Sequence, residues 1–135
     1  MGLPSSVKII RSLILASILL FSASIGSARD IVSLLNRDLT GIEGKESVML
    51  TVEYPPGWST AKHRHNAHVF VYVLEGSIVM QNEGGAPITL SPGQTFYESP
   101  EDVHSVARNA SDTQPAKFLV FIVKDKGAPI LIPVQ

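Results

Sequence analysis

Short runs of β-forming residues, separated by turns that contain glycine or proline, fill the chain from residue 46 to its end. Valine, isoleucine, threonine and aromatic residues are frequent in these runs, and no helical pattern separates them. Short strands joined by short turns favour an antiparallel sandwich or barrel. The sequence therefore predicts an all-β fold with strands over 46–54, 69–74, 77–81, 87–90, 95–98, 103–107, 117–123 and 130–132.

Length and composition limit the classes of protein to which the chain can belong. Its 135 residues, 44% of them hydrophobic and 17% charged, are enough for one packed domain. The absence of cysteine excludes disulfides, thiolate metal sites and a cysteine nucleophile. A formal net charge of −1, with no cluster of lysine or arginine, argues against nucleic acid as a partner.

Residues 1–28 are predicted to be a signal peptide. Lys8 and Arg11 give a positive start, Leu13–Phe21 is almost wholly apolar, and small residues lead to an expected cleavage site after Ala28. The alternative is a membrane anchor, but the apolar run is shorter than the ~20 residues that span a bilayer. We expect an exported protein, periplasmic or secreted, without stable membrane insertion. Cleavage would leave 9 Lys plus Arg against 12 Asp plus Glu, a net charge of −3.

Residues 29–45 are expected to form a lead-in to a single β domain over 46–135. Asp30 can cap a helix, and Gly41 and Gly44 would end it. The pattern predicts either one short helix over 30–39 or an irregular segment. Helical spacing relates the apolar residues Ile31, Leu34, Leu35 and Leu39.

Two histidines, His63 and His65, give the first indication of chemistry. Residues two apart on an extended strand point to the same face, so both imidazoles can reach one ion. Neutral imidazole is the commonest side-chain ligand for transition metals. A His-x-His pair alone is weak evidence for a site, and the alternative is a solvated turn that contains histidines.

Two longer patterns resemble the motifs of the cupin superfamily. Gly57-x5-His63-x-His65, followed by Tyr72-Val73-Leu74-Glu75-Gly76, resembles the first cupin motif. Pro92-Gly93, followed by Ser99 to His104 and then Asn109, resembles the second cupin motif. Only one hairpin separates the two motifs, as in small single-domain cupins. The resemblance implies an antiparallel double-stranded β-helix, or jelly-roll barrel. It also implies that His63, His65 and His104 point inward and bind a divalent transition metal ion: Fe, Mn, Zn, Ni or Cu.

The sequence departs from the family pattern at two positions. Val69 occupies the place of the motif-one glutamate, four residues after His65. The motif-two glycine is also missing, with Glu101 or Asp102 in its place. The three histidines therefore lack the usual glutamate as a fourth ligand, although three histidines can still bind a divalent ion and leave coordination positions open.

His68 and Glu98 are the candidates to complete the metal site. His68 adjoins the vacant position, but strand alternation places it on the opposite face from residue 69 unless a bulge re-aims it. Glu98 ends an apolar strand just before the turn that leads to His104. It can serve as a ligand or as an acid or base that moves a substrate proton. The alternatives are a solvated strand end for Glu98 and a rim position for His68.

Tyrosines are a second kind of catalytic candidate. Tyr72 and Tyr97 can donate a phenol hydrogen bond if they reach the cavity, although strand aromatics more often pack in the core or across strands. We count Tyr72, with Glu98, as a candidate catalytic residue.

The family resemblance implies two kinds of function. The first is a metal-dependent enzyme, oxygenase-like, that acts on a small oxygenated or aromatic compound. The alternative is a non-catalytic cupin that binds or senses a small ligand or a metal. Small cupins also resemble one another in pairing through edge strands and terminal segments, and the apolar tail 130–134 suits such packing. We expect a homodimer.

Overall fold

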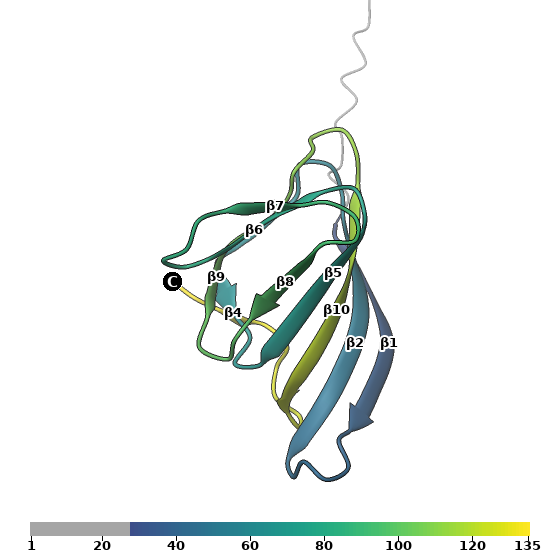
Figure 1. Ribbon diagram of the computed structural model, residues 1–135, viewed down its shortest axis with the longest axis vertical. Coiled ribbons are helices and arrows are strands. Elements are labelled where there is room, and N and C mark those ends of the chain that lie inside the picture. The colour runs from purple at the N-terminus through teal and green to yellow at the C-terminus, as the bar shows by residue number, and fades with distance from the viewer. Residues whose placement is uncertain (1–27) are drawn as a thin grey trace, which may run out of the picture.

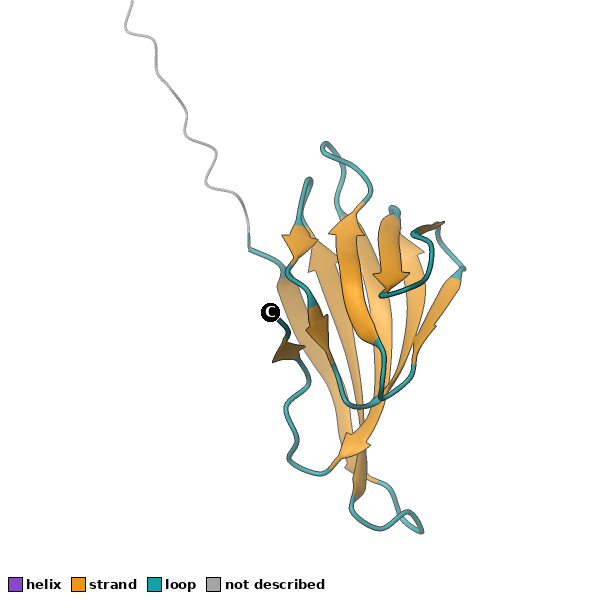
Figure 2. Cartoon of the chain, turned by 90° about the vertical axis from the view of Figure 1, so that its left-hand side faces the viewer, coloured by secondary structure: helices purple, strands orange, loops and turns teal. Residues whose placement is uncertain are grey.

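The computed structural model describes residues 28–135, which form two facing antiparallel sheets (Figures 1 and 2). The predicted signal peptide lies outside the described residues except for Ala28. The strands are β1 (Asp30–Asp38), β2 (Lys45–Tyr54), β3 (Ser59–Thr60), β4 (His63–Arg64), β5 (His68–Glu75), β6 (Ile78–Asn82), β7 (Ile88–Leu90), β8 (Thr95–Glu98), β9 (Val103–Asn109), β10 (Ala116–Asp125) and β11 (Ile132–Pro133).

Each sheet combines strands that are distant in sequence. One sheet has the order β1-β2-β10-β5-β8, and the other has the order β11-β4-β9-β6-β7 with β3 also paired to β9. Every pairing is antiparallel. This architecture confirms the predicted all-β jelly-roll fold. Within residues 28–135 there is no helix long and apolar enough to cross a bilayer.

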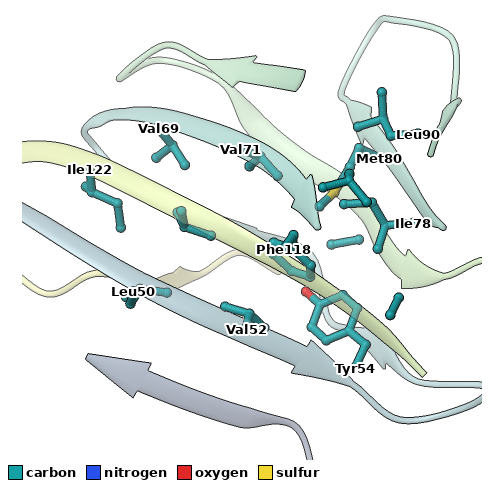
Figure 3. Close-up of a cluster of buried hydrophobic side chains, with 14 of the residues drawn as sticks. Leu50, Val52, Tyr54, Val69, Val71, Ile78, Met80, Leu90, Phe118 and Ile122 are labelled. Carbon is teal, nitrogen blue, oxygen red and sulfur yellow. The ribbon is translucent and has the colours of Figure 1, made fainter. Parts of the chain in front are cut away.

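The core lies between the sheets and follows strand alternation (Figure 3). On β5, Val69, Val71 and Val73 point inward, whereas the residues between them are exposed. On β10 the even-numbered residues from Ala116 to Ile122 are buried in the same way. Burial of a side chain of this size contributes roughly 1.5–3 kcal/mol. The inner faces of the sheets thus hold the fold together and form the walls around the histidines.

Most of the predicted strands are confirmed with small changes of boundary, but the last one, 130–132, overlaps β11 only at Ile132, and the short strands β3 and β4 were not predicted. β8 has the predicted bounds, and β5 extends the predicted run by one residue at each end. Turn residues set these boundaries. Gly76, just after β5, and Gly93, shortly before β8, both have positive φ angles that are incompatible with a strand.

The helix or irregular lead-in predicted over 29–45 is wrong for Asp30–Asp38, which is strand β1. β1 pairs with β2, and a register shift between Ser33 and Leu35 leaves Leu34 as an extra residue. A β-bulge of this kind breaks the two-residue alternation, so the apolar spacing resembles that of a helix. The free edge of β2 satisfies the backbone of β1, whereas a short isolated helix is only marginally stable. The sheet that contains β2 therefore also includes Asp30–Asp38.

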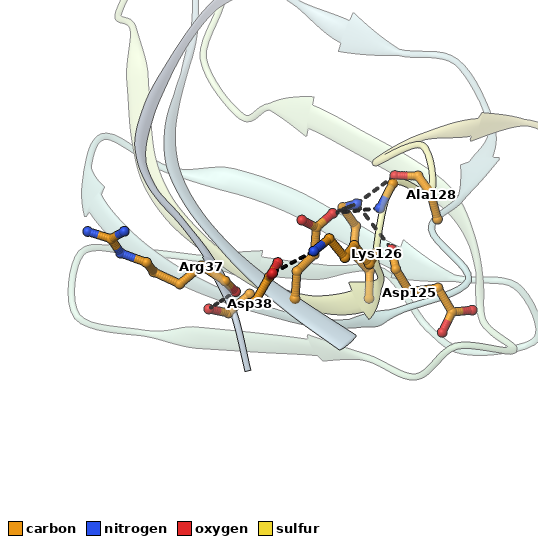
Figure 4. A network of polar contacts seen from close by, with 9 residues as sticks. Arg37, Asp38, Asp125, Lys126 and Ala128 are labelled. Atoms are coloured by element: carbon orange, nitrogen blue, oxygen red, sulfur yellow. Dashed lines mark hydrogen bonds and ion pairs between the residues drawn. The ribbon is translucent and has the colours of Figure 1, made fainter. Parts of the chain in front are cut away.

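A buried ion pair links the ends of β2 and β10. Glu46 and Lys124 are directly opposite in the ladder, and the Lys124 ammonium donates to the Glu46 carboxylate. Lys124 Nζ also donates to the Ala128 carbonyl at 2.6 Å, and the Gly127 N–H donates to Glu46 Oε1 at 3.1 Å. Figure 4 shows this network with the neighbouring pair of Lys126 and Asp38. The buried charges are tolerated because both are paired and hydrogen-bonded.

Candidate metal centre

Three histidines from two segments of the chain meet inside the barrel. His63 of β4 and His104 of β9 are directly opposite in the strand ladder, and their ring centroids are 5.0 Å apart. The ring of His65 lies 4.9 Å from that of His63. Each histidine offers a nitrogen, and the three nitrogens lie within 4.8 Å of one another. The His63/His65/His104 group can therefore hold a metal ion, as predicted.

A β-bulge directs His104 into the cavity. His104 and Ala107 are both buried although they are three residues apart, a spacing that places residues on opposite faces of a regular strand. The pairing of β9 with β6 shifts register here: Val106 is opposite Gln81, and His104 is opposite Asn82. Ser105 is the extra residue of the bulge, so His104 and Ala107 can both point inward.

Backbone carbonyls orient two of the three imidazoles. His63 Nδ1 lies 2.8 Å from the Ala61 carbonyl, and His65 Nδ1 is hydrogen-bonded to the Ile130 carbonyl. An N–H donated to a carbonyl fixes the tautomer and leaves Nε2 with a lone pair for a metal. Ile130 precedes β11, which pairs with β4. The apolar tail, predicted to suit contacts between subunits, thus orients a histidine of its own chain.

Glu98 lies beside the histidines, on the strand next to the position where the motif glutamate is missing. It lies directly opposite Val69 in the ladder between β8 and β5, and its exposure is only 2%. Its carboxylate oxygens lie 3.3 Å from His104 Nδ1 and 3.8 Å from His65 Nε2. The 3.8 Å between Glu98 Oε2 and His65 Nε2 suits two donor atoms of one ion, because donors bound at about 2.1 Å are themselves roughly 3–4 Å apart. The carboxylate missing at Val69 is therefore present on the neighbouring strand.

Burial sets the protonation of the cluster. It lowers the pKa of all three histidines, that of His104 to about 3, where the neighbouring His63 and His65 act in the same direction. Burial, followed by the charge of Asp102, raises the pKa of Glu98 to about 7. The histidines are therefore neutral at pH 7, which is the form that binds metal. The contact between Glu98 and His104 is accordingly not an ion pair in the absence of a cation.

The cluster has the polar groups that a cation would satisfy. His104 Nε2 and Glu98 Oε1 are both buried without a hydrogen-bond partner. Such unpaired buried atoms are costly, and each specific case needs an explanation, such as a bound ion. Nitrogen and carboxylate donors suit first-row divalent ions. The residues present thus fit a divalent transition metal ion.

The cluster lies in a cavity of about 200 Å³ with mainly aliphatic and aromatic walls. Apolar side chains from β2, β5 and β10 surround it, including Val52, Val71 and Phe118. An apolar cavity of ~150 Å³ binds benzene. The space is therefore suitable for one small organic molecule beside the ion.

A comparison with protein families assigns the chain. The cupin domain family matches residues 50–122, which include all three histidines and Glu98. The chain belongs to the cupin family. A comparison with curated protein sequences gives no significant match.

Solved structures that share the fold of this cupin come from different kinds of protein. The DMSP lyase DddQ from Ruegeria pomeroyi is 23% identical with a TM-score of 0.58, over 65% of this chain and 43% of the lyase. A double-stranded β-helix protein from Klebsiella pneumoniae is 18% identical, with a TM-score of 0.62 over 79% of this chain and 84% of that one. The cupin domain of an XRE family transcriptional regulator from Enterobacter cloacae is 22% identical, with a TM-score of 0.53 over 71% and 96%. This chain thus spans less than half of the lyase, and these similarities show the fold alone.

Two predicted site residues of this cupin lie outside the cavity. His68 is exposed, and its Nδ1 is 2.8 Å from the Tyr97 hydroxyl, against whose ring it stacks. Tyr72 is 44% exposed. No bulge interrupts β5 between these residues and the inward Val69 and Val71, so both point to the outer face. The structure therefore places neither His68 nor Tyr72 beside the three histidines.

Two residues that line the cavity were missed in the sequence. Tyr54 lies on the inward face of β2 with Leu50 and Val52, so strand alternation was a signal that could have identified it. Arg29 precedes β1 and lines the cavity from outside the motifs. No local pattern in the sequence indicates its position.

Proposed function

We propose that this cupin is a metal-dependent enzyme, oxygenase-like, that acts on a small oxygenated or aromatic compound. The observation that supports the proposal is the cluster of three neutral histidines and one buried carboxylate in an apolar cavity. His63, His65, His104 and Glu98 would hold the ion. A bound divalent ion supplies Lewis-acid chemistry, and as iron it supplies redox chemistry.

The protein groups around the ion would each have a distinct role. The apolar walls formed by β2, β5 and β10 exclude bulk water and strengthen electrostatic interactions within the cavity. The carbonyls of Ala61 and Ile130 hold two imidazoles in one orientation. The second oxygen of Glu98, if the first binds the ion, can hold a substrate proton within the cavity.

The second candidate function is a non-catalytic module that senses or binds a small ligand. Two observations favour it: the motif glutamate is replaced by Val69, and the same fold occurs in a transcriptional regulator. Ligand binding requires only the cavity and its polar groups, whereas turnover also requires the metal in a reactive state.

Metal loading followed by oxygen uptake distinguishes the two. We expect the protein, purified without a histidine tag and loaded with Fe²⁺, to bind about one ion per chain and to consume oxygen with a compound from a panel of catechols, diketones and flavonols. His104→Ala is the matched control, because it removes one ligand and should lose both properties. Ligand-induced thermal stabilisation without oxygen uptake or product would favour the binding module instead. Failure of the wild-type chain to bind any divalent ion would contradict the metal-dependent enzyme.

We also propose that a second copy of the chain covers the outer face of the β1-β2-β10-β5-β8 sheet. Phe70, Tyr72 and Tyr97 are each nearly half exposed there. Because an aromatic side chain can bury 150–250 Å², these three alone present about 300 Å². This is as large as the largest apolar patch on many monomers, and a standard interface needs about 800 Å² per partner. Exposed aliphatic residues of β1 and β5 extend the patch: Val32, Leu35 and Leu74.

Sedimentation equilibrium tests this interface. We expect a dimer for the wild-type protein and a monomer for the double variant Phe70→Ser with Tyr72→Ser, because polar side chains remove the apolar area. Ile42→Ser is the control, since Ile42 is 54% exposed in the turn after β1, away from the outer face. A wild-type protein that is still monomeric at about 100 μM would contradict the proposal.

A further inference from the structure

The cavity contains a cationic side chain that the metal centre does not use. Arg29 lines the metal cavity and also the groove beside it, which includes Trp58 and Thr60. Among residues 28–135, Arg29 is within ion-pair distance of no aspartate or glutamate. Lys62, the other cation of that groove, is paired with Glu83 at 2.6 Å. Arg29 is therefore the cation in this region that is available to a ligand.

The hydroxyl of Tyr54 adds a neutral donor next to Arg29. Tyr54 is 4% exposed, and its ring packs edge-on against Phe118 on the inner faces of β2 and β10 (Figure 3). Thr60 Oγ1 donates to the Tyr54 hydroxyl oxygen at 3.0 Å, so the phenol proton remains for another acceptor. Burial raises the pKa of Tyr54, while the Thr60 hydrogen bond and the charge of Arg29 oppose the rise. The phenol therefore stays protonated and close to the guanidinium.

The charges in the cavity do not cancel. A divalent ion held by neutral imidazoles and one carboxylate carries a net charge of +1, to which Arg29 adds another positive charge. Uncompensated charge in an apolar cavity is costly, and an anion would reduce that cost. Guanidinium groups also bind carboxylates through two parallel hydrogen bonds. The chemical character of the cavity is therefore that of a site for an organic anion.

We propose that Arg29 and Tyr54 form the anion-binding part of the cavity and that the natural ligand is a small carboxylate with an apolar body. This inference rests on the proposed function, because it assigns the substrate class of the same cavity. The volume of about 200 Å³ suits a carboxylate somewhat larger than benzene. The apolar body would contact the walls formed by Val52, Val71 and Phe118.

Calorimetric titration of the zinc-loaded protein with benzoate and benzamide tests the proposal. The two probes have similar size and shape, but only benzoate is charged. We expect the wild-type protein to bind benzoate at least tenfold more tightly than benzamide, because charge-assisted hydrogen bonds are the stronger kind. Arg29→Met should lower the affinity for benzoate about tenfold, without changing that for benzamide, and leave the zinc content at one ion per chain. Tyr54→Phe should weaken benzoate binding by a smaller factor.

Lys62→Met is the matched control, because it removes a cation of the adjacent groove that Glu83 already neutralises. It should leave benzoate affinity unchanged. The proposal fails if the zinc-loaded wild-type protein binds neither probe or shows no preference for benzoate. It also fails if the preference for benzoate is undiminished in Arg29→Met. It also fails if Arg29→Met loses its zinc, because Arg29 would then support the metal centre. A wild-type protein that binds no zinc would instead overturn the proposed function.

Discussion

Replacing Glu98 with valine is expected to lower the affinity for a divalent ion by more than the 10–100-fold that loss of an outer-shell partner typically costs. The reason is that Glu98 is the only carboxylate that the described structure places against two of the three histidines. The apo protein should be at least as stable as the wild type, because the change removes a buried oxygen without a hydrogen-bond partner. Competition with a chromogenic chelator gives the affinity, and thermal unfolding of the apo protein gives the stability.

The exchange variant Val69→Glu with Glu98→Val provides the sharper test. Residues 69 and 98 are directly opposite and both buried, and such side chains start about 5 Å apart. The exchange returns the carboxylate to the motif position and should recover most of the lost affinity. Glu101→Val is the control, because Glu101 is an exposed carboxylate three residues away and its loss should have no effect. Full metal affinity in Glu98→Val alone would mean that Glu98 acts on protons rather than as a ligand.

Replacing Gly76 with alanine is expected to destabilise the protein by about 3–5 kcal/mol. Gly76 has a φ of +67°, which is unfavourable for any residue with a Cβ. A Cβ there would also lie 2.4 Å from the Pro115 carbonyl oxygen and 2.8 Å from Ala116 Cα. These are backbone atoms at the start of β10, so they cannot move aside without disturbing the sheet.

Thermal unfolding measures this effect, and a fall in the melting temperature of more than about 10 °C is expected for a domain of this size. Gly84→Ala is the matched control. Gly84 also has a positive φ, of +83°, but its added Cβ would meet nothing within 4 Å. Gly84→Ala should therefore lower the free energy of unfolding only by the backbone strain, about 1–2 kcal/mol. Equal losses of stability in the two variants would show that the close contact with Pro115 and Ala116 does not contribute to the destabilisation.

Local patterns were reliable wherever the two-residue period of a strand was unbroken. The inward position of Val69 and Val71 and the burial of Ile122 follow directly from alternation. The same rule excludes His68 from the metal site. β1 was mispredicted because the extra residue Leu34 shifts the alternation within the strand, which then resembles a helix.

The sequence by itself determined the all-β class, the cupin resemblance and the three histidines, because periodicity, turn residues and motif spacing are local properties of the chain. Only the tertiary structure decided that Glu98 lies opposite Val69, that a bulge at Ser105 directs His104 inward, and that Arg29 borders the cavity. Those facts depend on which strands become neighbours. Strand pairing brings together residues far apart in the chain, so spacing along the sequence cannot reveal it.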